Sequence, residues 1–390
     1  MARLDGILTL DAARPEPAPS RRAPVTYAYD FSHQGVDYDC FPFGVWRRLS
    51  RDAVDEGDRT LMQAGHPQGL PDLRADIARY LHHARAVRCS PEQIIVSAGT
   101  EFLLQLLIQL LDDTAVFGIE NPGYEKLPMI FAASRACARA VPLDEHGMRP
   151  DALEQSGASV ACVTPSHQFP TGRIMPVARR IQLLNWAYEG TDRYILEDDY
   201  DSEFRYLGKP IPSLQGLDQR DRVIYIGAFS KSLSPALRLS YMVLPEPLVR
   251  RYRERLNFYL CPVPTLVQKT LHLFMEGGHL ERHLNRVRNL YRLKREALVA
   301  ALREALPGAR VHGASAGLHL TLRVGNGMSE EALIEAARAR QVKVYGLSRY
   351  YCACPDEPGE ATLLLGFATL RMEDIAPTAA LLRQAWFPQT

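Results

Sequence analysis

A lysine and an arginine stand close together behind one apolar run of the sequence. The run VIYI is followed by GAFSKSLSPALRLSYMVLP, in which Lys231 lies between two serines and Arg238 comes seven residues later. In open sheets of parallel strands, ligands bind beyond the carboxyl ends of the strands. A lysine amine at such a strand end could bond covalently to a carbonyl compound, and an arginine could bind an anion such as phosphate.

Other polar residues follow apolar runs in the same way. A turn of small residues at the start of a helix presents free backbone N–H groups to an anion. A carboxylate can hold a protonated nitrogen, a phenol can donate a hydrogen bond, and an aromatic ring can stack on a flat ligand. The candidates are Gly99, Thr100 and Glu101 after QIIVSA, Glu197, Asp198, Asp199 and Tyr200 after RYIL, and Tyr124 in the turn ENPGY.

Pyridoxal phosphate is a cofactor that uses this whole set of groups. Its aldehyde needs a lysine amine, its pyridine nitrogen a carboxylate, its ring hydroxyl a phenol, and its phosphate an arginine and a helix N-terminus. Each group alone has a simpler explanation, such as a solvated lysine, an acidic loop, a helix cap or a tyrosine of the core. Their order along one chain, each at a strand end, favours the cofactor.

Alternating strand-like and helix-like segments are expected to position these residues. The strand-like runs lack strict alternation of apolar and polar residues, which is typical of a mostly parallel sheet covered on both faces. The run EFLLQLLIQLL is apolar on nearly every side and predicts a helix buried against that sheet. We predict an α/β large domain over residues 60–275, with strands in QIIVSAGT, ASVACVTP, RYILEDD, RVIYIGA and LSYMVLP.

A second region has its own strand pattern. A charged helical stretch begins at GGHLERHL and leads to the apolar runs GLHLTLRV, KVYGL and TLLLGFA. We predict a smaller α+β domain formed by residues 26–59 and 276–390.

Composition excludes several classes of protein. The chain has 390 residues and a net charge of +1, which gives no electrostatic case for binding nucleic acid or an anionic membrane. Residues 1–25 are rich in Ala, Pro and Arg, and we interpret them as a linker-like tether, not a signal peptide, so a cytoplasmic location is expected. The seven cysteines form no zinc pattern, so we expect reduced, buried thiols and no metal site.

Six motifs make the chain resemble a known family. They are HPQGLPDLR (66–74), ENPGY (120–124), TPSHQFPTG (164–172), ILEDDYDSEFRY (195–206), YIGAFSKSLSPALRLSYMVLP (225–245) and LLLGFA (363–368). With them the chain resembles fold type I pyridoxal-phosphate aminotransferases, and within these the aminotransferase-like effector domain of MocR-type regulators of the GntR superfamily. The resemblance implies a two-domain, usually dimeric fold with its site at the boundary between domains and subunits.

The resemblance implies a role for each residue around the cofactor ring. Lys231 would form the Schiff base, Asp198 would hold the pyridine nitrogen, and Tyr200 would reach the ring hydroxyl. Tyr124 would stack on the ring. His167, together with its neighbour Gln168, would either line the pocket or belong to a purely structural turn.

At the phosphate, the resemblance implies contacts from Arg238 and from the backbone of Gly99 and Thr100, with Ser230 nearby. Two contacts usual in aminotransferases are missing. Ala64 stands where a tyrosine usually reaches the phosphate from the partner subunit, and Ala228 stands where a hydroxyl residue is usual. We therefore expect the cofactor to be held more weakly than in a catalytic aminotransferase.

The substrate side departs further from the family pattern. Leu364 occupies the position at which aminotransferases commonly carry the arginine for the substrate carboxylate, and Phe169 replaces the usual Asn of the NPTG turn. A bidentate contact between arginine and carboxylate is a strong charge-assisted interaction, so its loss weakens binding of an amino acid. Arg349 is a candidate substitute, or an ordinary surface arginine.

Two functions fit these features. The favoured one is a sensor domain of a MocR-type transcriptional regulator that responds to an amine, an amino acid or the cofactor itself. In this interpretation the chain forms a homodimer, lacks its winged-helix DNA-binding module and does not bind nucleic acid directly. The alternative is a free-standing pyridoxal-phosphate-dependent aminotransferase that acts on an amino acid or amine.

Overall fold

The structure is a computed structural model that describes residues 26–55, 59–208, 211–352 and 360–387. The predicted tether over residues 1–25 and Cys354 lie outside these ranges. No helix among the described residues is both long and apolar enough to cross a membrane.

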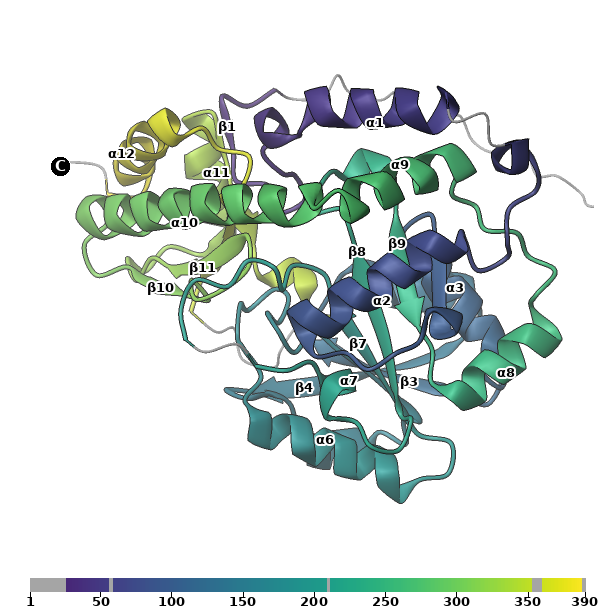
Figure 1. Ribbon diagram of the computed structural model, residues 1–390. Helices are drawn as coiled ribbons and strands as arrows, with labels where there is room; N and C mark the ends of the chain where they lie inside the picture. The colour runs from purple at the N-terminus through teal and green to yellow at the C-terminus, as the bar shows by residue number, and fades with distance from the viewer. Residues whose placement is uncertain (1–25, 56–58, 209–210, 353–359, 388–390) are drawn as a thin grey trace, which may run out of the picture.

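An eight-stranded sheet forms the centre of the larger lobe (Figure 1). The strand order is β2-β9-β8-β7-β6-β3-β4-β5, and the neighbours from β8 to β4 all run parallel. β9 is antiparallel to both of its neighbours, and β5 is antiparallel to β4. The mostly parallel sheet is confirmed, with the strands β2 (Ile94–Ser97), β3 (Val116–Asn121), β4 (Cys137–Asp144), β5 (Gly147–Met148), β6 (Val160–Val163), β7 (Tyr194–Asp199), β8 (Val223–Ala228) and β9 (Ser240–Val243).

Both faces of this sheet are covered by helices. Side chains of successive strand residues point to opposite faces, so Ile224 and Ile226 of β8 belong to one apolar cluster and Tyr225 to another. One face carries α3 (Thr100–Leu110), α4 (Lys126–Ala133) and α8 (Glu246–Arg255). The other carries α1 (Phe43–Asp55), α2 (Pro71–Arg85), α5 (Pro150–Gln155), α6 (Val177–Glu189), α7 (Leu214–Leu217) and α9 (Thr265–Glu276).

A smaller lobe is built on an antiparallel sheet of order β10-β11-β14-β13, formed by Arg310–His312, His319–Arg323, Thr362–Gly366 and Tyr345–Gly346. Helix α10 (His279–Ala305) lies above this sheet in Figure 1, and α11 (Glu330–Ala339) and α12 (Ile375–Trp386) share its apolar core. β1 (Tyr29–Asp30) pairs in parallel with β12 (Val342–Lys343). The beginning of the described chain is thereby joined to its last third.

The cysteines are free thiols in the part of the chain that the structure describes. Cys162 is buried in the sheet, and burial raises the pKa of its thiol. Cys137 and Cys352 are exposed, so the expectation of buried thiols is wrong for these two. Cys137 is the first residue of β4, and Cys352 lies outside the helices and strands.

Candidate cofactor site

A cavity of about 240 Å³ lies beyond the carboxyl ends of the parallel strands, where the chain was expected to bind a ligand. Residues that follow β2, β3, β6, β7 and β8 all contribute to its lining, because these strands run in one direction. The cavity brings together eight of the nine predicted site residues: Gly99, Thr100, Tyr124, Asp198, Tyr200, Ser230, Lys231 and Arg238.

Lys231 follows β8 and projects toward a segment that is distant in sequence. Its Nζ donates hydrogen bonds to the backbone carbonyls of His33 and, at 3.0 Å, Gln34. Burial lowers the pKa of Lys231 to about 8, although the negative charge of Asp201 acts in the opposite direction. Roughly one amine in ten is then unprotonated and nucleophilic at pH 7, far more than for an ordinary lysine.

Asp198 lies near the end of β7 and presents its carboxyl group to the cavity. Burial raises its pKa to about 7, and the neighbouring charges of Asp199 and Asp201 add to the effect. A positive charge placed beside this carboxyl would favour its ionised form. The site therefore suits a ligand that brings a cationic N–H group to Asp198.

The two acidic neighbours of Asp198 on β7 have structural roles. Glu197 accepts hydrogen bonds from the backbone N–H groups of Leu214 and Gln215, at 2.8 and 2.9 Å, at the start of α7. Asp199 is buried and lies 2.7 Å from Arg85 Nε. Sequence reasoning missed these roles, yet strand alternation gives the signal for them, since residues on either side of Asp198 must face away from it.

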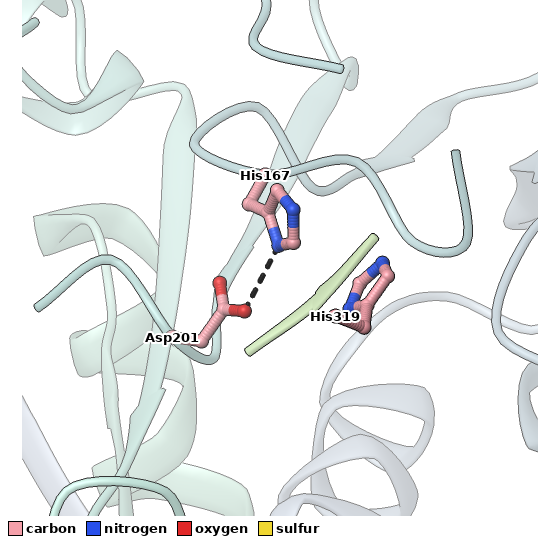
Figure 2. Close-up of side chains that lie close together, drawn as sticks. All are labelled: His167, Asp201 and His319. Atoms are coloured by element: carbon pink, nitrogen blue, oxygen red, sulfur yellow. Dashed lines mark hydrogen bonds and ion pairs between the residues drawn. The ribbon is translucent and has the colours of Figure 1, made fainter. Parts of the chain in front are cut away.

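The hydroxyl of Tyr200 contacts His167, which Figure 2 shows beside Asp201. This hydroxyl donates to the backbone carbonyl of His167 at 2.9 Å and lies 3.1 Å from His167 Nδ1, which is also 2.9 Å from Asp201 Oδ2. His167 and Gln168 are both buried and neither is among the lining residues. The geometry favours the structural alternative for this turn, in which His167 contacts the hydroxyl of Tyr200 and does not line the cavity.

His319 completes the group drawn in Figure 2 and was not anticipated from the sequence. Its ring centroid lies 4.4 Å from that of His167, and burial keeps its pKa well below the ordinary value, so it is neutral. Ligand atoms of His167, Asp201 and His319 lie within 4.8 Å of one another, as in a site that could hold a metal ion. His167 and Asp201 instead bond to each other, and His319 Nε2 donates to the carbonyl of Pro170 at 3.2 Å.

The start of α3 and Arg238 form one end of the cavity. Arg238 has a left-handed backbone (φ 48°), and its Nη2 donates to the carbonyl of Ala98 at 3.3 Å. The Gly99 N–H donates to Ser240 Oγ at 3.0 Å, so this N–H is already used within the protein. We expected the backbone N–H groups of Gly99 and Thr100 to contact the phosphate. Thr100, the first residue of α3, is the better placed of the two to donate its N–H.

Ala64 and Ala228, which replace two residues that usually contact the phosphate, lie in different places. Ala228 lines the cavity, and Ser230, two residues later, brings the only serine hydroxyl among the described lining residues. Ala64 is exposed and is not part of the lining.

Phe169 lines the cavity and belongs to a small apolar and aromatic cluster. Leu364 is fully buried beside Phe169 and Tyr350. Arg349, the candidate for a carboxylate contact, instead forms hydrogen bonds to Glu125 Oε2 at 2.7 and 3.0 Å. Arg349 lies outside the cavity lining, so the geometry does not favour it as a replacement for the carboxylate-binding arginine.

Comparison with known proteins agrees with this fold. The model of the aminotransferase class I and II family matches residues 37–379. The uncharacterized HTH-type transcriptional regulator YdeL of Bacillus subtilis is 42% identical over 358 residues, which cover 92% of this chain and 76% of YdeL. The probable rhizopine catabolism regulatory protein MocR of Rhizobium meliloti is 33% identical over 339 residues, 86% of this chain and 68% of MocR.

A solved structure with the same fold is LysN, the alpha-aminoadipate aminotransferase of Thermus thermophilus, complexed with N-(5'-phosphopyridoxyl)-L-leucine. It has a TM-score of 0.77 and 28% identity, over 92% of this chain and 91% of LysN. The chain belongs to the aminotransferase class I and II family and has the fold type I architecture. Within it, the chain is an aminotransferase-like domain of the kind found in MocR-type regulators, and its cofactor is pyridoxal phosphate.

Proposed function

We propose that this chain is a sensor domain that holds pyridoxal phosphate and reports the cofactor, or a small amine that reacts with it, to a transcriptional regulator. One observation carries the proposal. The cavity lining combines an amine, a carboxyl group, two phenols and a guanidinium group that suit the cofactor, whereas among the described lining residues the cations other than Lys231 pair with Glu101, and Arg349 pairs with Glu125 outside the lining.

The proposed roles follow from the chemistry of the lining groups. Lys231 would hold the cofactor by condensing its amine with the cofactor aldehyde, with loss of water, and its lowered pKa of about 8 would assist that reaction. Asp198 would accept the hydrogen bond of the pyridinium nitrogen, Tyr200 would bond the ring hydroxyl, and Tyr124 would cover the ring. Thr100 and Arg238 would bind the phosphate, as a helix start and a guanidinium group commonly do.

When bound, pyridoxal phosphate supplies an aldehyde that bonds to amines and a ring that accepts electrons from the attached carbon. The protein residues decide which amines reach it. The described cationic side chains in the lining are Lys126, Lys231 and Arg238. Lys231 has its own covalent role, while Lys126 and Arg238 both pair with Glu101.

The effector that fits this cavity is a small primary amine whose recognition does not depend on an α-carboxylate, or the cofactor alone. The cavity lining includes the neutral His33, the neutral His319, Phe169 and Leu318, and the charge nearest in effect to Lys231 is the negative one of Asp201. Such surroundings disfavour an unpaired carboxylate, because removing its charge from water costs several kcal/mol (about 1–3 for a lost hydrogen bond alone).

A homodimer is the assembly that we propose for the sensor. Phe258, Tyr259 and Leu260 are consecutive and exposed, with relative exposures of 72%, 42% and 57%. Contiguous exposed apolar residues commonly mark an interaction site. Sedimentation equilibrium on the purified chain tests the assembly, and a monomer at all concentrations would exclude it.

The first experiment is titration of the purified chain with pyridoxal phosphate, followed by visible absorbance and borohydride trapping. We expect the wild-type protein to form a covalent adduct that mass spectrometry places on Lys231, and Lys231→Ala to form none. Failure of the wild type to form the adduct would contradict the proposed function.

The second step separates a sensor from an enzyme. A panel of amines and amino acids is added to the loaded protein, with and without a keto acid. A sensor gives spectral changes that stop at binding. Multiple turnovers within seconds, at ordinary enzyme rates, would favour the aminotransferase alternative, which the presence of Lys231, Asp198 and Tyr200 in one cavity keeps open.

A further inference from the structure

Three anion-binding donors at the phosphate end of the cavity are already directed at one carboxylate. Glu101, the second residue of α3, accepts a hydrogen bond from Arg238 Nη2 at 2.9 Å, and its Oε1 lies 3.3 Å from Lys126 Nζ. Burial opposes its charge, but hydrogen bonds from its own backbone N–H, Arg238 and Lys126 hold the pKa of Glu101 below its ordinary value. Glu101 is therefore an anion at neutral pH.

The position of this ion pair is fixed by Gly99. A Cβ atom at Gly99 would lie 2.1 Å from Arg238 Nη2 and 2.9 Å from Glu101 Oε2. Both charged groups thus lie directly over the glycine backbone at the start of α3. This is the place where a helix N-terminus and an arginine would meet a phosphate group.

The carboxylate and the phosphate must compete for the same donors. Glu101 cancels one of the two positive charges that Arg238 and Lys126 bring to this end of the cavity. A phosphate dianion either displaces the carboxylate from Arg238 or binds beside a like charge, and both lower its affinity.

We propose that Glu101 is an internal competitor for the cofactor phosphate and sets how tightly the protein holds its cofactor. The inference rests on the cofactor assignment above and adds to it a single residue that weakens retention. A sensor of cofactor level needs a site whose dissociation constant lies within the range of free cofactor concentrations. The charge of Glu101 raises that dissociation constant.

The test uses probes that do not depend on Lys231. Binding of 4-deoxypyridoxine 5'-phosphate, which lacks the aldehyde, and of inorganic phosphate is measured by isothermal titration calorimetry on the full chain. Glu101→Gln keeps the size of the side chain and removes its charge. We expect both probes to bind about tenfold more tightly or better, since a like charge within several ångströms is removed.

The matched control is Glu145→Gln, at a side chain that is 80% exposed and outside the cavity. It should leave both affinities unchanged, which separates a local effect from one of net charge. If Glu101→Gln binds the probes as the wild type does, or more weakly, the proposal is overturned. Weaker binding would identify Glu101 as a positioning residue for Arg238. Absence of probe binding in both proteins would overturn it as well, whereas a missing covalent adduct on Lys231 would contradict the proposed function alone.

Discussion

At the scale of single residues, burial gives Lys231 its reactivity. The amine lies among neutral groups and backbone carbonyls, and the charge of Asp201 only partly offsets the cost of burying an ammonium group. The unprotonated form, which is the nucleophile, is consequently populated near neutral pH.

The rate at which pyridoxal phosphate attaches to Lys231 should therefore rise with pH and level off above about 8. Half of the amines are free at that pH; about one unit below it the lysine is mostly charged and unreactive, and about one unit above it the amine is mostly free. Stopped-flow absorbance between pH 6 and pH 10 measures this profile, with free Nα-acetyl-lysine under the same conditions as the reference. A midpoint near that of an ordinary lysine, about 10, would contradict the burial argument.

At the scale of elements, the sequence predicts which strands carry the site but not how the remaining polar residues are used. Short apolar runs and the polar residues that end them locate β2, β6, β7, β8 and β9 and the residues that follow them. Because parallel strands share one carboxyl edge, eight of the nine predicted residues meet in one cavity.

The residues that the sequence did not reveal come from contacts between distant segments. His33 and Gln34 lie almost 200 residues before Lys231, and His319 lies on the smaller sheet. Nothing in local periodicity places them at the site. Glu101 was visible beside Gly99 and Thr100, but its role depends on the direction of its side chain, which only the folded packing against Arg238 decides.

The start of α3 depends on Gly99, and this gives a prediction at the element scale. Gly99 has φ 105° and ψ 159°, a conformation that is essentially restricted to glycine, and a Cβ would collide with the Arg238 guanidinium. We expect Gly99→Ala to lower the free energy of unfolding by about 2–3 kcal/mol and to weaken binding of phosphate-bearing ligands. Urea denaturation and calorimetry measure the two effects.

The control for that variant is Gly157→Ala. Gly157 also has a positive φ, 68°, but a Cβ there meets nothing within 4 Å. Gly157→Ala should lower the free energy of unfolding by about 1 kcal/mol, the cost of a left-handed backbone at a residue other than glycine, and leave ligand binding unchanged. Equal losses of stability and unchanged ligand affinity in both variants would show that the contact of Gly99 with Arg238 is unimportant.

At the scale of the whole molecule, residues 29–36 connect the cofactor site to both lobes. β1 pairs with β12, and the Gly366 N–H donates to the carbonyl of Phe31 at 2.9 Å, so one part of this segment is held by the smaller lobe. Two residues further on, the carbonyls of His33 and Gln34 accept hydrogen bonds from Lys231 of the larger lobe. The chemical state of the Lys231 amine therefore decides whether these two hydrogen bonds to the beginning of the described chain can form.

This arrangement predicts that covalent attachment of the cofactor loosens the segment. A lysine nitrogen bonded to an aldehyde carbon keeps at most one N–H and cannot donate to both carbonyls. We expect amides of residues 32–36 to exchange hydrogen faster with pyridoxal phosphate bound than with 4-deoxypyridoxine 5'-phosphate, which fills the cavity without bonding to Lys231. Hydrogen-exchange mass spectrometry measures the difference, with the buried strand β6 as an internal reference that should not change. Equal exchange with the two ligands would mean that the state of the lysine is not transmitted to this segment, and a sensor would then need another route from its cofactor to the rest of the regulator.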